Sequence, residues 1–169
     1  MDKPDYKTAL IVGAGEGISA SMARLLASHG LRVALAARHP EKLGDLCRQT
    51  GATAYACDAT NADEVAKLFG TIERDSGAPD FVLYNASARA RGTFVDLAPA
   101  DVSQAIAISG FGGFLVAQQA LKRMLPEKRG AIFFTGASAS VKGYPQSAAF
   151  AMGKFALRGL AQSLAREFS

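Results

Sequence analysis

The first 30 residues contain the pattern that most restricts the fold: an apolar run, closely spaced glycines and a helical apolar pattern. The run covers Ala9 to Val12, and glycines follow at positions 13, 15 and 17. Apolar side chains then recur at helical spacing, at Ile18, Met22, Leu25 and Leu26. We therefore expect a buried strand, a tight turn and a helix. Glycine lets a turn approach a ligand closely, and a helix N-terminus offers free N–H groups to a phosphate.

The spacing of these glycines differs from the G-x-G-x-x-G fingerprint, because Ser19 and Ala20 follow where that pattern has its last glycine. A glycine-rich turn of this kind can also be purely structural. The turn alone therefore leaves dinucleotide binding and a ligand-free turn as alternatives.

Length and composition favour one α/β domain. The chain has 169 residues, of which 49% are apolar and 20% charged. No uninterrupted apolar run approaches the roughly 18 residues of a membrane span. The N-terminus lacks the apolar segment of a signal peptide, so we expect a cytoplasmic protein without a membrane partner.

The cysteines, histidines and basic residues point to no metal site and no nucleic acid. Cys47 and Cys57 have no C-x-x-C partner, so free thiols are expected. His29 precedes Gly30 at a predicted helix end, where we expect it to cap the helix, and His39 is the only other histidine. The net charge of +4 is spread along the chain without an aromatic-interleaved basic stripe, and it also suits a phosphate-rich cofactor.

Strands and helices alternate along the rest of the chain. Further strands are predicted at 32–37, 53–56, 81–84 and 131–135, and helices at 41–49, 62–74, 101–125 and 148–168. Pro40 is expected to open the helix over 41–49 and Ser147 to cap the last one. The alternation predicts an α/β fold with a doubly wound parallel sheet, whose ligands lie at the carboxyl ends of the strands.

Four short motifs stand in an informative order along this pattern. Gly13-x-x-x-Gly17-Ile18 lies in the first turn, Asp58 follows the third strand, Asn85-Ala86 follow the fourth, and Lys154 lies in the last helix. Together with the ending Phe155 to Glu167, this order resembles the short-chain dehydrogenase/reductase family. The resemblance implies a Rossmann-like three-layer αβα domain over residues 1–169 that binds NAD(P). It also implies a small-molecule carbonyl or alcohol substrate.

The resemblance assigns the cofactor to one group of residues: Gly13, Gly15, Glu16, Gly17, Ile18, Arg38, Asp58, Ala59, Asn85, Ala86, Ser87 and Lys154. Asp58 is expected to accept a hydrogen bond from the adenine amino group, and the Asn85-Ala86 backbone to line the adenosine and ribose. Two structural roles are also open: Asp58 can cap the following turn, and Asn85 can tie two strands together.

The end of the second predicted strand indicates the coenzyme. An acid there binds the ribose 2′-OH, whereas arginine accommodates a 2′-phosphate. The chain has Ala36-Ala37-Arg38 and no acid, which favours NADP over NAD. Glu16 argues against this, because NADP-binding relatives often carry a basic residue in that turn.

The catalytic residues of the family are incomplete. The family uses a Tyr-x-x-x-Lys pair, a serine on the preceding loop and an asparagine on the long helix. Lys154 is present, but Phe150 takes the tyrosine position and has no proton to give. Ungapped alignment puts Ala137 at the serine position with Ser138 beside it, and Ser109 at the asparagine position.

Two residues are candidate replacements for the missing groups. A one-residue loop shift would bring Ser138 into the serine position. Tyr144 offers a phenol on the same loop, although an aromatic packed over the core is the favoured interpretation. Water and Tyr144 are the candidate proton donors.

Two readings of function therefore stay open. The first is an NADP(H)-dependent oxidoreductase in which Lys154 orients the nicotinamide and Ser138 the substrate oxygen. The second is a non-catalytic NAD(P)-binding protein, such as a redox sensor or partner subunit. The first is preferred.

The last helix and the chain length add two expectations. Small residues crowd the last helix, so we expect a homo-oligomer through the long helices or close packing within the chain. Family members usually continue by about 80 residues, so we expect a fragment that lacks the C-terminal strands, with its fifth strand at an open edge.

Overall fold

The structure, a computed structural model, describes residues 5–168 and contains one parallel sheet. The strands follow the order β3-β2-β1-β4-β5, and every neighbouring pair is parallel. Their bounds are Thr8–Val12 (β1), Arg32–Ala37 (β2), Thr53–Ala56 (β3), Phe81–Tyr84 (β4) and Ala131–Phe134 (β5). Along the chain, β2 and β3 are added on one side of β1, and β4 and β5 on its other side. This change of side confirms the doubly wound topology.

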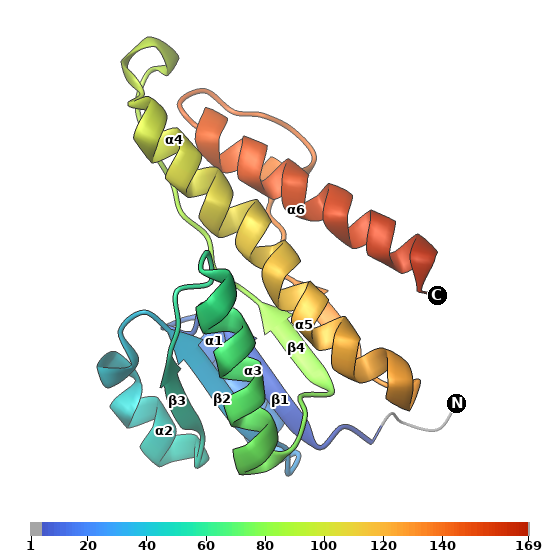
Figure 1. Cartoon of the computed structure of the whole chain (residues 1–169). Coiled ribbons are helices and arrows are strands. Elements are labelled where there is room, and N and C mark those ends of the chain that lie inside the picture. The colour runs from blue at the N-terminus through green and yellow to red at the C-terminus, as the bar shows by residue number, and fades with distance from the viewer. Residues whose placement is uncertain (1–4, 169) are drawn as a thin grey trace.

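Helices connect the strands as the alternation predicts (Figure 1). They are Ile18–Ser28 (α1), Gly44–Thr50 (α2), Ala62–Ser76 (α3), Pro99–Ile106 (α4), Gly112–Glu127 (α5) and Ala148–Glu167 (α6). Short 3₁₀ turns cover Pro40–Leu43, Phe94–Asp96 and Ser138–Ser140, and a π-helical segment, Ala107–Phe111, joins α4 to α5.

Two apolar clusters fix the layers on the two faces of the sheet. Ala9 and Ile11 of β1 pack toward α1 and α2, whereas Leu10 and Val12 pack toward α3, α5 and α6. This alternation follows from the two-residue period of a strand. All four side chains are buried, so the sheet is covered on both faces as the three-layer fold requires.

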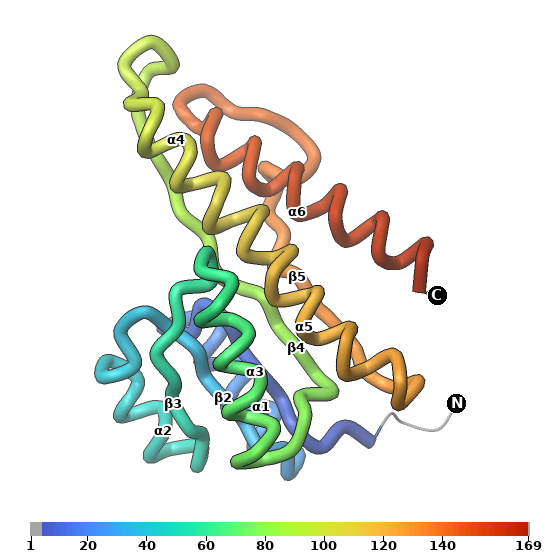
Figure 2. The backbone as a smooth tube through the Cα atoms, in the orientation of Figure 1, coloured from blue at the N-terminus to red at the C-terminus, as the bar shows by residue number. Residues whose placement is uncertain are grey.

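Three predicted details of the helices are wrong. The helix expected over 101–125 is two α-helices joined by the π segment, and the backbone runs on through them as one long rod (Figure 2). Pro40 opens a 3₁₀ turn, and α2 begins only at Gly44. Ser147 stands at the N-cap of α6, but its side chain makes no capping hydrogen bond.

Two predictions about single residues are confirmed. His29 caps α1, because its ring Nδ1 lies 2.9 Å from the Leu25 carbonyl oxygen. Cys47 and Cys57 are free thiols, and Cys57 is buried.

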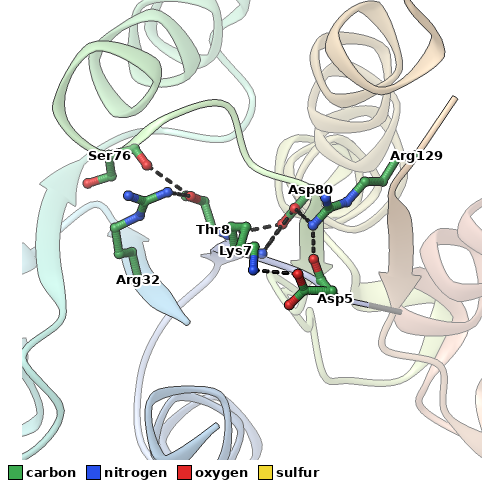
Figure 3. A network of polar contacts seen from close by, with 7 residues as sticks. All are labelled: Asp5, Lys7, Thr8, Arg32, Ser76, Asp80 and Arg129. Carbon is green, nitrogen blue, oxygen red and sulfur yellow. Dashed lines mark hydrogen bonds and ion pairs between the residues drawn. The ribbon is translucent and has the colours of Figure 1, made fainter. Parts of the chain in front are cut away.

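A polar network holds the end of the sheet opposite the glycine turn (Figure 3). Asp80, just before β4, accepts hydrogen bonds from the backbone N–H groups of Lys7 and Thr8 at 3.0 Å, and pairs with Arg129 at 2.7 Å. The Thr8 hydroxyl donates to the Ser76 carbonyl at 2.9 Å. These contacts fix the start of β1 to the segment before β4. They therefore help to hold in place the strand that leads to the glycine turn.

The long rod and the outer strand have apolar character. Pro99–Glu127 is long and apolar enough, by length and composition alone, to cross a membrane, a test that buried core helices also pass. Its inner side packs in the core through Leu115, Val116 and Ala120.

At the sheet edge, β5 pairs only with β4 within residues 5–168, and Phe133 is exposed there.

Candidate active site at the carboxyl ends of the strands

The glycine turn is shaped by contact with the segment that follows β4. Gly13 has a φ of +79°, and a Cβ built there would lie 2.3 Å from the Ala86 nitrogen. Only glycine fits this position, since a side chain would collide with backbone and also adopt a disfavoured angle. Gly17 has a φ of +77°, and no atom lies within 4 Å of a Cβ built at Gly15 or Gly17. The turn is therefore tightly packed at Gly13, against Ala86, and has free space at Gly15 and Gly17.

A buried hydrogen-bond network locks this turn to the end of β4. The Asn85 side-chain amide donates to the Ser19 hydroxyl at 2.8 Å and to the Gly13 carbonyl at 3.3 Å. The Ser19 hydroxyl in turn donates to the Gly13 carbonyl at 3.1 Å, and Ser19 is fully buried. Asn85 thus performs the tying role considered for it. Ser19, noted in the sequence only as an interruption of the glycine pattern, is the residue that completes the lock.

Asp58 adopts the turn-capping role. Its carboxylate accepts from the Thr60 backbone N–H at 2.9 Å and from the Thr60 hydroxyl at 2.8 Å. These two bonds, with a smaller contribution from Arg38, hold the pKa of Asp58 below its ordinary value. Asp58 is thereby fixed as an ionised acceptor beside the glycine turn, and its second carboxylate oxygen makes no hydrogen bond within residues 5–168.

A cleft of about 830 Å³ opens over these elements. Nine of the predicted cofactor residues line it: Gly13, Gly15, Glu16, Arg38, Asp58, Ala59, Asn85, Ala86 and Ser87. Gly17, Ile18 and Lys154 do not line this cleft. Gly17 is the N-cap of α1, and Ile18 begins that helix with an exposed side chain.

The cleft suits a ligand that carries phosphate groups. α1 begins beside it without a side-chain cap and without an acid in its first turn, so its first N–H groups stay available. Arg24 and Lys42 also line the cleft and were not predicted as site residues. Helical periodicity alone does not reveal them, because Arg24 lies in α1 and Lys42 in the 3₁₀ turn after β2, and only the fold places both at the same cleft as Arg38. The glycine turn, the free helix start and the basic side chains together fit a dinucleotide.

Lys154 lies at the same carboxyl end of the sheet, next to the end of β5. Its ammonium donates to the Thr135 carbonyl at 2.7 Å, and the side chain is 3% exposed. Burial, and secondly the nearby charge of Arg89, lower the pKa of Lys154 from its ordinary value. The cation is therefore held rigidly by a neutral partner.

Phe150 is buried against two cations. The Arg89 guanidinium carbon lies 4.2 Å from the centre of the phenyl ring, and the Lys154 ammonium 5.7 Å from it. The phenyl ring packs with Ala139, Ala151 and Ala137. Arg89 lies in the loop that follows β4 and was not predicted as a site residue. No local pattern singles it out, because it reaches Phe150 from a position 61 residues earlier in the chain.

The two residues that carry the candidate hydroxyl groups on the loop are both exposed. Ser138 begins a 3₁₀ turn and is exposed, with no side-chain hydrogen bond in the described part of the chain. Tyr144 does not pack over the core as favoured: it is 40% exposed, and the Lys142 ammonium lies 5.1 Å from its ring centre.

The π-helical segment places Ser109 close to α6 and to the loop after β4. Ser109 is fully buried, and its hydroxyl accepts from the Ala88 N–H at 3.4 Å. A Cβ built on Gly153 would lie 2.6 Å from the Ser109 Cβ, so glycine is needed for this helix contact. Tyr84 donates its hydroxyl to the Ile108 carbonyl in the same segment. Ser109 thus serves to pack this corner of the site.

Comparison with known proteins agrees with this geometry. A family profile described as short chain dehydrogenase matches residues 7–169. The chain belongs to the short-chain dehydrogenase family. It is 29% identical to short chain aldehyde dehydrogenase 1 of Euphorbia lathyris, over 95% of this chain and 58% of that protein.

Two solved structures share the fold closely. A metagenomic short-chain oxidoreductase in complex with NADP has a TM-score of 0.91 and 30% identity, over 95% of this chain and 76% of that one. The F189W actinorhodin polyketide ketoreductase with NADPH has a TM-score of 0.92 and 28% identity, over 99% and 67%. The chain spans 58% and 61% of the length of two curated relatives that it matches.

Proposed function

We propose that this chain forms the coenzyme-binding part of an NADP(H)-dependent oxidoreductase that acts on a small carbonyl or alcohol substrate. The observation that carries the proposal is the cleft beside the start of α1, where the Gly13 turn, Asp58 and Asn85 meet at the carboxyl end of the sheet. Such a position is where open parallel sheets bind nucleotides. The two solved structures in complex with NADP and with NADPH support the same interpretation.

NADP rather than NAD is proposed from the charges at the end of β2. Arg38 lines the cleft directly after Ala37, and Arg24 and Lys42 line it too. Three cations suit a 2′-phosphate, which an acid in that place would repel. Three carboxylates, of Glu16, Asp45 and Asp58, also line the cleft. Asp45 pairs with Arg48, which lies outside the lining, and Asp58 accepts two hydrogen bonds from Thr60, so Glu16 is the carboxylate left to oppose the three cations.

Several side chains have distinct roles in this proposal. Asp58 accepts the adenine amino group through its remaining oxygen, and the Asn85-Ala86 backbone lines the adenosine. Lys154 orients the nicotinamide ribose, while Ser138 positions the substrate oxygen. A bound nicotinamide supplies or accepts the hydride. Phe150 has no proton to give, so we assign the proton donor to solvent rather than to Tyr144, which is exposed on the loop.

The first test is calorimetric titration of the purified chain with NADPH and with NADH. Heat is a suitable signal because the chain has no tryptophan. We expect NADPH to bind at least about tenfold more tightly than NADH, and Arg38→Gln to remove that preference. Arg74→Gln, on α3 and outside the cleft, is the matched control. Equal binding of both coenzymes to the wild type would overturn the NADP assignment.

Turnover separates the two functional readings. Oxidation of NADPH against a carbonyl panel supports an oxidoreductase, and Phe150→Tyr is expected to raise the rate by restoring a phenol four residues before Lys154. Binding of NADPH without turnover by the full-length protein would instead favour the non-catalytic alternative.

A homo-oligomer through the long helices is part of the same proposal. Phe111, Phe114, Met152 and Phe155 are exposed on the π segment, α5 and α6, and an apolar surface of this kind favours association. Part of the small-residue pattern is already used within the chain, since Gly153 packs on Ser109. Sedimentation of the purified protein tests the proposal: a monomer at micromolar concentration would contradict it. Cytoplasmic location, and the absence of nucleic-acid and membrane partners, stay predictions.

A further inference from the structure

Tyr84 links two parts of the cleft lining without lining the cleft itself. It ends β4 directly before Asn85, and its side chain is fully buried. Its hydroxyl donates a hydrogen bond to the carbonyl oxygen of Ile108, in the π segment. Asn85 and Ile108 both line the cleft, so this bond joins the end of β4 to a residue on the long rod across a buried contact.

Two glycines let the long rod approach this phenol closely. A Cβ built on Gly112 would lie 2.3 Å from the Tyr84 hydroxyl oxygen and 2.9 Å from the Ala59 carbonyl oxygen. A Cβ built on Gly113 would lie 3.5 Å from the Tyr84 ring and 2.5 Å from a methyl carbon of Leu157. Side chains at these positions would push the rod away from β4, so the two glycines and the tyrosine form one close contact.

The π segment that receives this hydrogen bond also contacts the loop after β4. A π turn is rare, and it appears mostly as a single turn inside an α-helix. Here the backbone hydrogen bond that closes the segment spans five residues. The same segment carries Ser109, whose hydroxyl accepts from the Ala88 N–H at 3.4 Å. Because Ala88 follows Ser87, which lines the cleft, a shift of the π segment would reach the cleft through this loop as well as through Ile108.

We propose that Tyr84 is a positioning residue for coenzyme binding: its hydroxyl fixes the π segment, and thereby sets the place of Ile108 and of the loop after β4 in the cleft. The proposal rests on the proposed function in one respect, namely that the ligand of this cleft is the coenzyme. Without the hydroxyl, the Ile108 carbonyl loses this donor, and the π segment loses the contact that ties it to β4.

The position of Tyr84 in the sheet predicts which affinities change. Arg38, which we assign to the 2′-phosphate, follows β2, and β2 lies two strands away from β4. Because neighbouring strands lie about 4.8 Å apart, the ends of β2 and β4 are about 10 Å apart. A shift of the π segment should therefore weaken the binding of NADPH and of NADH by the same factor, and leave the ratio of the two affinities unchanged.

Calorimetric titration of Tyr84→Phe with NADPH and with NADH tests the proposal. The variant keeps the ring and loses only the hydroxyl, so it is expected to fold. We expect both coenzymes to bind about threefold to tenfold more weakly than to the wild type, the range that one hydrogen bond supplies. Arg38→Gln, in contrast, should change the ratio of the two affinities.

A second variant tests the route through the π segment. Ser109→Ala removes the acceptor of the Ala88 N–H and should weaken both coenzymes by a similar factor. The double variant Tyr84→Phe/Ser109→Ala should lose less affinity than the product of the two single losses, because both changes act through the same segment. Fully independent losses would contradict this route.

Two control variants separate positioning from a general loss of stability. Tyr55→Phe removes a hydroxyl on β3 that donates to Asp75 at 3.2 Å, and Ile72→Val removes one buried methylene from α3. Neither residue lines the cleft. Urea denaturation gives the stability of each variant, and both controls should bind the coenzymes within about twofold of the wild type. An equal loss of affinity in Ile72→Val and Tyr84→Phe would overturn the proposal.

Hydrogen exchange tests the positioning in the absence of coenzyme. The backbone N–H groups of Ala88 and of the π segment should exchange faster in Tyr84→Phe than in the wild type, and at an unchanged rate in Tyr55→Phe. If Tyr84→Phe binds NADPH as tightly as the wild type does, the inference is wrong and the coenzyme assignment stands. If the wild type binds neither coenzyme, the proposed function fails, and the exchange rates alone decide whether Tyr84 holds the π segment.

Discussion

Replacement of Gly13 by alanine probes the contact that closes the site. The left-handed backbone angle costs about 1–2 kcal/mol for an alanine. The new Cβ would also lie 2.3 Å from the Ala86 nitrogen, which is backbone and must move as a unit. Overpacking of this kind adds about 1–3 kcal/mol, so we expect Gly13→Ala to lower the unfolding free energy by about 2–5 kcal/mol.

Two other glycines separate the backbone term from the steric term. Gly51 has a φ of +69° but open space around a built Cβ, so Gly51→Ala should lose only the backbone contribution of about 1–2 kcal/mol. Gly15 has neither constraint, and Gly15→Ala should change stability by no more than about 0.5 kcal/mol.

Urea denaturation of the three variants provides the measurement. With an m-value of about 2 kcal/mol/M, Gly13→Ala should lower the midpoint by about 1–2.5 M. Displacement of Ala86 should weaken NADPH binding in the same variant. If Gly13→Ala loses no more stability than Gly51→Ala, the close approach of Ala86 to the turn is not a constraint, and the reasoning fails.

Three further outcomes follow from contacts elsewhere in the fold. Asp80→Ala should lower the unfolding free energy by about 2–3 kcal/mol in urea denaturation, because two backbone N–H groups lose a charged acceptor; an unchanged midpoint would contradict this. Burial, with nearby carboxylates, raises the pKa of Cys57 to about 12. Iodoacetamide at pH 8 should therefore modify Cys47 and spare Cys57 in the native protein, which peptide mass spectrometry can check. NMR titration should find the pKa of Lys154 below 10.5 and show it rising in Arg89→Gln. In the wild type, the unfolded chain binds the Lys154 proton more tightly than the folded protein does. The contribution of Lys154 to the unfolding free energy therefore increases as pH rises toward 10.5, and Lys154→Met should lack this increase.

Local patterns were sufficient to predict the sheet and the glycine turn. The apolar runs Ala9–Val12 and Phe81–Tyr84 are typical of buried parallel strands, and Gly13 marks where the chain turns. The residues assigned to the cofactor therefore meet at one end of the sheet, as the order of motifs predicts. The interruption of the long helix was missed, because a π segment depends on packing against α6 and has no periodicity of its own.

The unpredicted parts of the site depend on long-range contacts. Ser19 looks like a defect in a glycine pattern until Asn85 is placed 2.8 Å from its hydroxyl. Arg89 looks like one of two loop arginines until Phe150 is found against its guanidinium. Both pairs join segments more than 60 residues apart, a separation that no spacing rule describes.

The π segment Ala107–Phe111 also sets the rotational phase of the long rod. One extra residue in a turn rotates everything before it by about 100° relative to everything after it. With that offset α4 presents Ala105 to α6, while α5 turns Leu115 and Val116 toward the sheet. Deletion of a single residue from the segment would restore a continuous helix and point one of these two faces at solvent. The π segment thus lets α4 pack on α6 and α5 pack on the sheet at the same time. The number of residues in the rod is therefore constrained by both packing surfaces.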